Sequence, residues 1–437
     1  MLYVLYSLAL AAALAVSSPY WLYQFWRHGK YSRGFAERMG RVPSRLGASH
    51  GRVVWIHAVS VGEVLAVSRL VTEIRQAYPG HRVVVSTTTD TGQDLARKRF
   101  GEENVFYFPL DFAFAIRPYL SALQPEIVIL AETEFWPNFL RLTASSGARI
   151  AVVNARISDR SWPRYRRFRW ALRKMLGQVD LFLAQTEPDC DRLQSIGAEP
   201  SRIHVIGNLK FDVPLPSTPA IVETLRLSLA AENAFPVLVC GSTVEDEEPP
   251  LLKAFENLRV GHPRAVMILA PRHPERFDAV AILVQQLGIA LHRRSRWQGE
   301  PLVGGVLLVD TIGELAALYS LADIAFVGGS LVPRGGHNII EPAQHGVAVV
   351  TGNHTDNFRD IVGLFCSHDA VRIVGLAELP LTLMQLADNT EERIALGRRA
   401  RETMRSQMGA TAKTLDAVGG LLKGGSFANL SKPSQQA

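Results

Sequence analysis

The chain has 437 residues, of which 47% are apolar and 20% charged; this globular composition leaves room for two domains and excludes a mainly disordered chain. Three cysteines, Cys190, Cys240 and Cys366, lie far apart without a Cys-x-x-Cys spacing, which excludes a disulfide framework or a zinc knuckle and fits a reducing compartment. A formal net charge of +6 predicts an anionic partner, which is nucleic acid, membrane lipid or an acidic substrate.

Residues 1–26 carry no charge, and their apolar run ends in Tyr and Trp residues. Six basic residues follow, Arg27, Lys30, Arg33, Arg38, Arg41 and Arg45, opposed only by Glu37. A signal peptide would carry its positive charge before the apolar run. We therefore expect a single uncleaved anchor helix in the inner (cytoplasmic) membrane, with the rest of the chain on the cytoplasmic side. Whether the segment spans the bilayer or lies in its interface stays open.

From Val53 onward, short β-branched runs alternate with segments of helical length. Seven runs predict a Rossmann-like α/β domain over residues 27–212, and the proline-bearing residues 213–220 predict a linker. Five more runs predict a second Rossmann-like domain over residues 221–405, followed by a C-terminal helix and polar tail at 406–437. Two such domains are expected to face one cleft with the carboxyl ends of their strands.

Acidic residues follow two of the first domain's predicted strands. Glu63 comes after residues 53–58, and Glu132 and Glu134 come after residues 126–131. Acids at helix starts are often caps, and for Glu134 this interpretation or another structural role is favoured. For Glu63 and Glu132 a functional role is favoured, because loops at strand ends carry chemistry. Lys210, at the end of this domain, is expected to lie where the cleft closes.

Residues 160–174 interleave basic and aromatic side chains. Those predicted to meet an anionic surface are Arg164, Arg166, Arg167, Arg169 and Trp170. Such a segment suits either nucleic acid or anionic lipid headgroups, and the expected anchor favours inner-membrane phospholipid and not nucleic acid. A solvated helix face with partly buried aromatics is the alternative.

A glycine-rich stretch, residues 326–342, follows a predicted strand of the second domain. The pairs Gly328–Gly329 and Gly335–Gly336 let backbone N–H groups approach a phosphate, although they are also compatible with simple tight turns. A helix is predicted to begin at His337, with Glu341 placed to bind a ribose.

Two further loops of this domain are expected to surround the same phosphate. Ser242 and Thr243 follow one predicted strand, and Pro271 and Arg272 follow another. The Arg272 guanidinium suits bidentate recognition of phosphoryl oxygens.

Taken together, the motifs resemble the 3-deoxy-D-manno-octulosonic acid (Kdo) transferase family of lipopolysaccharide biosynthesis. The blocks that carry the resemblance are SVGE, ETEFWPN, NARIS, GNLKFD, APRHPERF, FVGGSLVPRGGHN and the position of Glu341. Departures from the family pattern are Val244, where a histidine is usual, Pro333 and Ile339.

The resemblance implies a GT-B glycosyltransferase that moves Kdo from CMP-Kdo, bound by the second domain, to the lipid A precursor lipid IVA, bound by the first. It implies that Glu63 is the catalytic base and that Glu132 and Lys210 assist the transition state. The residues that it implies for CMP are Pro271, Arg272, Ile312, Gly313, Glu314, Asn338, Ile339, Ile340 and Glu341, besides the loop residues Ser242, Thr243, Gly335 and Gly336.

Inverting transfer from a sugar nucleotide needs one carboxylate base and cations for the leaving phosphate. We expect no metal or other cofactor, because no Asp-x-Asp pair follows a strand and CMP-sugars carry a single phosphate. The rivals are a dinucleotide-dependent oxidoreductase, which lacks its Gly-x-Gly-x-x-Gly turn here, and a membrane-tethered binding module. Among glycosyltransferases the nearest alternative uses a nucleoside-diphosphate sugar, as a membrane GlcNAc transferase does. The number of Kdo residues added, the acyl pattern of the acceptor and the oligomeric state stay open.

Overall fold

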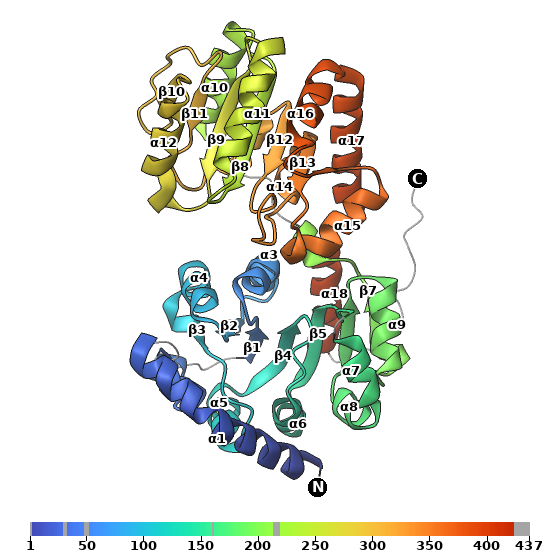
Figure 1. The fold of residues 1–437 in the computed structure, drawn as a ribbon. Helices are drawn as coiled ribbons and strands as arrows, with labels where there is room; N and C mark the ends of the chain where they lie inside the picture. Colours follow the sequence, from blue (N-terminus) through green and yellow to red (C-terminus); the bar gives the residue numbers. More distant parts are fainter. Residues whose placement is uncertain (1, 29–32, 48–51, 160, 213–218, 424–437) are drawn as a thin grey trace. The chain divides into compact units, whose positions relative to one another are not determined.

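The structure is a computed structural model that describes residues 2–28, 33–47, 52–159, 161–212 and 219–423. The chain divides into two compact units (Figure 1), of which unit 1 comprises residues 1–213 and 407–437 and unit 2 residues 214–406. Most of the expected linker at 213–220, and the polar tail from residue 424, lie outside the described residues.

Unit 1 is built on a parallel seven-stranded sheet in the order β3-β2-β1-β4-β5-β6-β7. The strands are β1 (Arg52–His57), β2 (His81–Thr87), β3 (Val105–Tyr107), β4 (Pro125–Ala131), β5 (Arg149–Ala155), β6 (Leu181–Ala184) and β7 (Ile203–Val205). The central strand β1 is buried from Val53 to His57, because helices cover both faces of the sheet.

One face of this sheet is covered by α3 (Val61–Ala77), α4 (Asp90–Phe100) and α18 (Ala410–Leu422). The other face carries α5 (Ala113–Leu123), α6 (Pro137–Ser145), α8 (Arg169–Leu176) and α9 (Glu187–Ser195), with α7 (Trp162–Arg167) beside them. The C-terminal helix α18 thus completes the core of the unit that begins the chain.

Unit 2 holds a second parallel seven-stranded sheet, in the order β10-β11-β9-β8-β12-β13-β14. Its strands are β8 (Val237–Thr243), β9 (Val266–Pro271), β10 (Leu291–Arg293), β11 (Val306–Leu308), β12 (Ile324–Val327), β13 (Ala348–Gly352) and β14 (Arg372–Val374). Its helices are α10 (Ala220–Ala231), α11 (Glu248–Gly261), α12 (Phe277–Gln286), α13 (Leu315–Leu318), α14 (Ile340–His345), α15 (Arg359–Ser367), α16 (Leu379–Asp388) and α17 (Thr390–Ser406). The prediction of two parallel α/β domains is confirmed, and the short strands β10 and β14 were not predicted.

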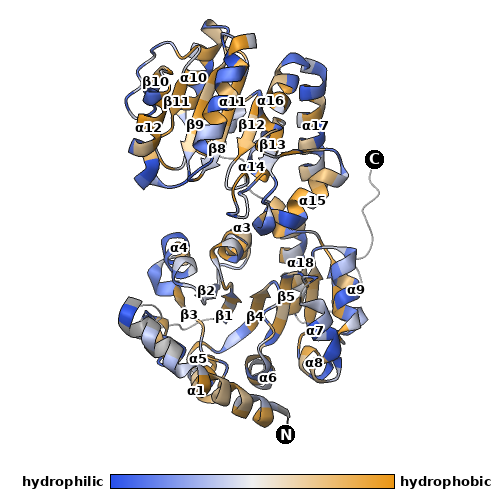
Figure 2. Ribbon diagram, in the orientation of Figure 1, coloured by the Kyte–Doolittle hydropathy of each residue, from blue (hydrophilic) through white to orange (hydrophobic). Residues whose placement is uncertain are grey.

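The N-terminal helix α1 (Leu2–His28) packs on α6 of unit 1. Asn138 of α6 donates a hydrogen bond from Nδ2 to Ser7 Oγ at 2.9 Å, and Arg141 lies over the Tyr3 ring. Other side chains of α1, such as Val4 and Leu8, are exposed, and Figure 2 shows the hydrophobic colouring of this half of the helix. Among the described residues, no helix meets the length and hydropathy needed to cross a bilayer. The membrane anchor therefore remains a prediction.

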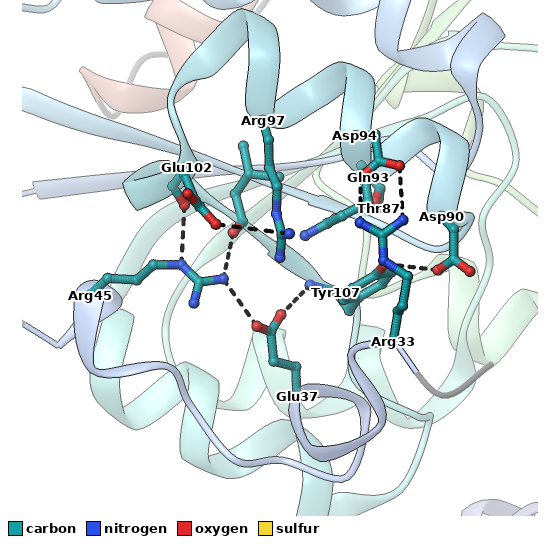
Figure 3. Close-up of polar contacts among 11 residues, drawn as sticks. Arg33, Glu37, Arg45, Thr87, Asp90, Gln93, Asp94, Arg97, Glu102 and Tyr107 are labelled. Carbon is teal, nitrogen blue, oxygen red and sulfur yellow. Dashed lines mark hydrogen bonds and ion pairs between the residues drawn. The ribbon is translucent and has the colours of Figure 1, made fainter. Parts of the chain in front are cut away.

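Basic residues that follow α1 contact unit 1 itself (Figure 3). Arg33 forms two hydrogen bonds with the Asp94 carboxylate, and Arg45 pairs with Glu37 at 3.0 Å. Glu37 also accepts the backbone N–H of Tyr107, which joins α2 (Phe35–Arg38) to β3. Arg33 and Arg45 therefore have partners within the protein, which the sequence analysis did not predict when it assigned them to a lipid-facing flank.

Candidate active site

In unit 1, Glu63 lies at the start of α3, directly after the central strand β1. Its side chain is 9% exposed, and the carboxylate accepts the Val59 N–H at 2.9 Å and the Ser60 hydroxyl at 3.1 Å. Burial raises the pKa of Glu63 to about 7, although the Val59 hydrogen bond lowers it, and the charges of Glu132 and Glu134 raise it further. The group therefore makes the local contacts of a cap and can also take up a proton near neutral pH.

Glu132 and Lys210 form an ion pair at the carboxyl edge of the same sheet. The distance from Lys210 Nζ to Glu132 Oε1 is 3.3 Å, and both side chains are about a quarter exposed, at 27% and 26%. Glu132 follows β4 with a φ of 58°, a left-handed conformation that is strained for a residue with a side chain. Such strain is often found where a side chain must be presented for function.

Glu134 accepts the Trp136 indole N–H at 2.9 Å, and burial raises its pKa. Its neighbour Phe135 contacts Tyr165 of α7, with ring centroids 6.3 Å apart. The acidic loop after β4 is thereby attached to the basic segment. This contact with an indole is a structural role, one of the two interpretations favoured for Glu134.

The basic segment forms α7 and α8 at the surface of unit 1. All five side chains predicted to meet an anionic surface are exposed: Arg164, Arg166, Arg167, Arg169 and Trp170. Trp170 is 68% exposed, whereas Trp162 is partly buried, with the Arg166 guanidinium 5.1 Å from its ring. One tryptophan thus packs on the domain while the other extends into solvent.

In unit 2, the predicted donor residues follow four strands that are neighbours in the sheet, in the order β11, β9, β8 and β12. Ser242 has a φ of 56°, and the Thr243 hydroxyl donates to Glu248 Oε1 at 3.1 Å. The backbone N–H of Arg272 donates to Thr243 O, so the loops after β8 and β9 are joined while the Arg272 side chain stays exposed.

The glycine-rich loop after β12 is held by a carboxylate from within the protein. Glu247 is fully buried and accepts the backbone N–H groups of Gly329, Ser330 and Leu331, each at 2.7 or 2.8 Å. It also accepts the Val244 N–H at 3.0 Å. The expectation that the Gly328–Gly329 pair offers its amides to a phosphate is wrong, because the Gly328 N–H donates to Gly241 O at 2.9 Å and Glu247 accepts the Gly329 N–H.

The second glycine pair and the helix after it have a different geometry. Gly335 and Gly336 have φ angles of 88° and 74°, and a Cβ at Gly335 would lie 2.4 Å from the Asn357 amide nitrogen. The following helix α14 begins at Ile340, and not at His337 as predicted, so Glu341 is its second residue. The preceding residues stay irregular because Asn338 Oδ1 accepts the Ile340 N–H and starts the helix there.

The positive charge of Arg272 acts on two groups within unit 2, Glu341 and His337. Burial raises the pKa of Glu341, while the hydrogen bond from Asn338 and the Arg272 charge lower it. Burial, together with the positive charges of Arg272 and His273, lowers the pKa of His337 to about 4. His337 is therefore neutral at physiological pH, and Arg272 is the permanent cation of this group.

The remaining predicted donor contacts are of three kinds. Ile339 and Ile340 are buried at 0% and 1%, so in this structure neither residue presents surface to a ligand. Ile312 is 82% exposed beside Gly313, whose φ is 93°. Glu314 accepts hydrogen bonds from Arg294 at 2.7 Å and Thr311 at 2.6 Å, which fixes the loop after β11.

Within the described ranges, no group of three or more His, Cys, Asp or Glu side chains is arranged to hold a metal ion. The expectation of a reaction without a metal remains a prediction.

Sequence reasoning missed Glu247 and Glu248, whose side chains are fully buried. They belong to the charged run Glu245–Glu248, which is typical of a solvated surface. The available signal was their position directly after a strand, the same signal that singled out Glu63.

Comparisons with known proteins identify relatives along nearly the whole chain. A family model described as 3-deoxy-D-manno-octulosonic-acid transferase (kdotransferase) matches residues 33–213. The 3-deoxy-D-manno-octulosonic acid transferase of Haemophilus influenzae is 33% identical over 396 residues, which cover 89% of this chain and 91% of that protein. The protein of the same name from Bordetella pertussis is 36% identical over 421 residues, or 91% of this chain and 95% of that one.

Solved structures share the fold at low identity. A putative UDP-N-acetylglucosamine 2-epimerase from Listeria monocytogenes gives a TM-score of 0.55 at 15% identity, covering 86% of this chain and 97% of that one. A glycosyltransferase from Rickettsia africae gives 0.52 at 15% identity, covering 86% and 100%. The two parallel-sheet α/β domains therefore resemble those of GT-B glycosyltransferases.

Proposed function

This chain belongs to the 3-deoxy-D-manno-octulosonic acid transferase family, and from that premise we propose that it moves Kdo from CMP-Kdo to the lipid A precursor lipid IVA with inversion at the anomeric carbon. Family membership makes it a Kdo-transferring glycosyltransferase. The identity of the donor nucleotide, the lipid acceptor, the inversion and the roles of individual residues are the content of the proposal.

The observation that carries the proposal is the Glu63 carboxylate. It is 9% exposed, has a pKa raised to about 7 by burial, and follows the central strand of unit 1. In the proposed reaction, Glu63 accepts the proton of the attacking acceptor hydroxyl as the bond to the Kdo anomeric carbon forms. A base whose pKa lies near the working pH is efficient in both its proton states. A single base without a covalent sugar intermediate gives inversion.

Glu132 and Lys210 are proposed to support this step. Lys210 contributes a positive charge whose partner in the free protein is Glu132, 3.3 Å away. Because the leaving phosphate gains negative charge in the transition state, an ammonium group directed to it lowers the barrier. Glu132 keeps that ammonium in place and, through its own charge, helps to raise the pKa of Glu63.

Unit 2 is proposed to bind the CMP part of the donor. The exposed guanidinium of Arg272 suits the phosphate, and Glu341, which is oriented by Asn338, suits the ribose hydroxyls. Ser242, Thr243, Pro271, Gly335 and Gly336 would contribute loop backbone. The exposed Ile312–Gly313 turn would contact the cytosine ring of CMP.

The inner membrane is the proposed location, with both units on the cytoplasmic side. The support is the exposed apolar face of α1 together with the exposed arginines and Trp170 of α7 and α8. Such a combination binds anionic lipid surfaces, and arginines pair well with the phosphates of a lipid A precursor.

A transfer assay with membranes or detergent micelles tests the proposal. We expect radiolabelled Kdo to pass from CMP-Kdo to lipid IVA, with release of CMP and with an anomeric configuration, read by NMR, opposite to that of the donor. UDP-GlcNAc in place of CMP-Kdo is the matched control and should give no product. Transfer from UDP-GlcNAc alone, or a product with retained configuration, would contradict the donor or the stereochemical assignment respectively. Activity in excess EDTA is also expected, since no metal is required.

A further inference from the structure

Three amide side chains connect the ends of β5 and β6 to the turn that carries Lys210. Asn154 Oδ1 accepts the Leu209 N–H at 3.0 Å, and its backbone carbonyl accepts Gln185 Nε2 at 3.0 Å. Gln185 Oε1 in turn accepts Asn208 Nδ2 at 3.0 Å. Asn208 Oδ1 completes the series by accepting the Lys210 N–H at 2.9 Å.

Two of these amides, those of Asn154 and Gln185, are held within the core and not at the surface. Asn154 is fully buried and Gln185 is 6% exposed, so their positions are fixed by surrounding packing. Asn154 also has a φ of 54° and is the penultimate residue of β5, the neighbour of β4, and Glu132 directly after β4 has a φ of 58°. Two strained residues at adjacent strand ends are maintained only where neighbouring contacts over-determine them.

The turn that depends on these contacts is short. Leu209–Phe211 is a single 3-10 turn of three residues, and both backbone N–H groups at its start are bonded to the amides of Asn154 and Asn208. A turn of this length makes few hydrogen bonds of its own, so its orientation is set by the side chains that hold it.

We propose that Asn154, Gln185 and Asn208 form a hydrogen-bond relay that positions Lys210 for the transfer reaction, with Gln185 as the link on which the relay depends. The inference rests on the proposed function, in which the Lys210 ammonium stabilises the leaving phosphate. These three are positioning residues, since they act through the backbone of the Lys210 turn.

Removing Gln185 breaks two links at once while leaving Lys210 and Glu132 chemically unchanged. Gln185→Leu has similar volume and suits a buried site, but it can neither donate to Asn154 nor accept from Asn208. A displacement of about 1 Å in a reacting group costs up to about 10²-fold in rate. We expect Gln185→Leu to lower kcat by about tenfold or more and to leave KM for CMP-Kdo nearly unchanged.

A double-mutant cycle separates positioning from general destabilisation. Lys210→Ala should lower kcat further than Gln185→Leu, and adding Gln185→Leu to it should change kcat no more, because the positioned group is already gone. A purely structural role predicts the same loss from Gln185→Leu in both backgrounds and overturns the proposal. Gln194→Leu on α9, at an exposed position, is the matched control and should retain normal kcat.

A chemical readout makes the inference independent of catalysis. In wild-type protein the Lys210 amine, 27% exposed and paired with Glu132, should undergo reductive methylation more slowly than Lys253, which is 70% exposed. Gln185→Leu should raise the Lys210 rate several-fold relative to Lys253, whereas Gln194→Leu should not. If Gln185→Leu fails to fold, Asn208→Leu, at a half-buried position, makes the same test.

The two readouts also separate the two hypotheses. A wild-type protein that transfers no Kdo rejects the proposed function, and the methylation rates still decide on the relay. An active wild type together with unchanged methylation and unchanged kcat in Gln185→Leu rejects the relay alone.

Discussion

Glu63 and Glu247 stand at corresponding places in the two units and have opposite surroundings. Each follows the first strand of its unit in the chain, β1 or β8, at the start of the next helix, α3 or α11. Glu63 is 9% exposed and accepts one backbone N–H and one hydroxyl. Glu247 is fully buried and accepts four backbone N–H groups.

The two carboxylates differ in the number of backbone N–H groups that they accept. This difference distinguishes Glu63, the proposed base, from Glu247, which holds a loop. Hydrogen bonds to a charged group each contribute about 1.5–3 kcal/mol, so four of them hold Glu247 and the loop after β12 firmly together. Burial raises the pKa of Glu63 to about 7, its single backbone donor lowers it, and two neighbouring carboxylates raise it further. The position after a strand therefore gives both carboxylates the same location in their units. The backbone N–H groups nearby determine whether the carboxylate holds a loop or can take up a proton.

The largest expected effect is on turnover in Glu63→Gln. Glutamine keeps the size and most of the contacts but cannot act as a base, so kcat should fall by about 10²–10⁴-fold. CMP affinity, measured by calorimetry, should be unchanged. A stable variant that keeps more than about a tenth of wild-type turnover would remove Glu63 from this role.

The raised pKa of Glu63 gives the next effect, a dependence on pH. Because the base must be ionised, kcat/KM should fall about tenfold per pH unit below about 7. Folding stability has the opposite slope: from pH 4.5 to about 7 the unfolded chain loses the proton that the folded chain retains, so stability declines. The melting temperature of Glu63→Gln, relative to that of wild type, should therefore increase as pH rises from 4.5 to about 7. A constant difference across it would contradict the assigned shift.

Arg272→Ala removes the exposed cation of unit 2, which contrasts with the buried carboxylate of Glu247 in the same unit. Loss of a charge-assisted hydrogen bond should weaken CMP-Kdo binding by about 1.5–3 kcal/mol, with little change in melting temperature because the side chain is exposed. Arg276→Ala is the informative contrast, since Arg276 pairs with the buried Glu248 at 2.9 Å and its loss should lower stability. Unchanged CMP affinity in Arg272→Ala would place the phosphate elsewhere.

Glu247→Gln should have a smaller effect on CMP binding than Arg272→Ala and a clear effect on stability. The amide brings an NH₂ group against backbone N–H donors, so the loop after β12 loosens and CMP affinity should fall by roughly tenfold, the equivalent of one lost hydrogen bond of about 1.4 kcal/mol. Glu245→Gln, at an exposed position of the same run, is the control and should change neither quantity. Equal CMP affinity and equal stability in the two variants would contradict the role of Glu247 in holding the loop after β12.

The sequence predicted the parts of this molecule that depend on local pattern. The apolar runs of β1, β4 and β12 are recognisable because strands buried on both faces are continuously apolar. Glu63 was found from its place after such a run. Its raised pKa was not, because it depends first on burial in the folded unit and then on Glu132 and Glu134, which are distant in the chain and become neighbours only when β4 lies beside β1.

Features that depend on distant partners escaped the sequence analysis for the same reason. Arg33 belongs to a basic cluster, and only folding brings it to Asp94, 61 residues away. Gln185 has no pattern that distinguishes it from a surface glutamine, yet it is 6% exposed. The predicted start of α14 was too early because Asn338 Oδ1 accepts the Ile340 N–H, and propensity alone does not determine such a boundary.

The C-terminal helix α18 gives unit 1 an unusual order of assembly during translation. Ala410, Ala417, Val418 and Leu421 complete a core formed with α3 and the sheet, and Asp212 accepts the N–H groups of Gly409 and Thr411 where this helix begins. Ribosomes add about 5–20 residues per second, so α18 emerges roughly 10–40 s after the rest of unit 1. Unit 2, contiguous over residues 214–406, can finish folding first. During that interval the part of the unit 1 sheet that α18 covers stays exposed. A chaperone that binds apolar surface would bind there.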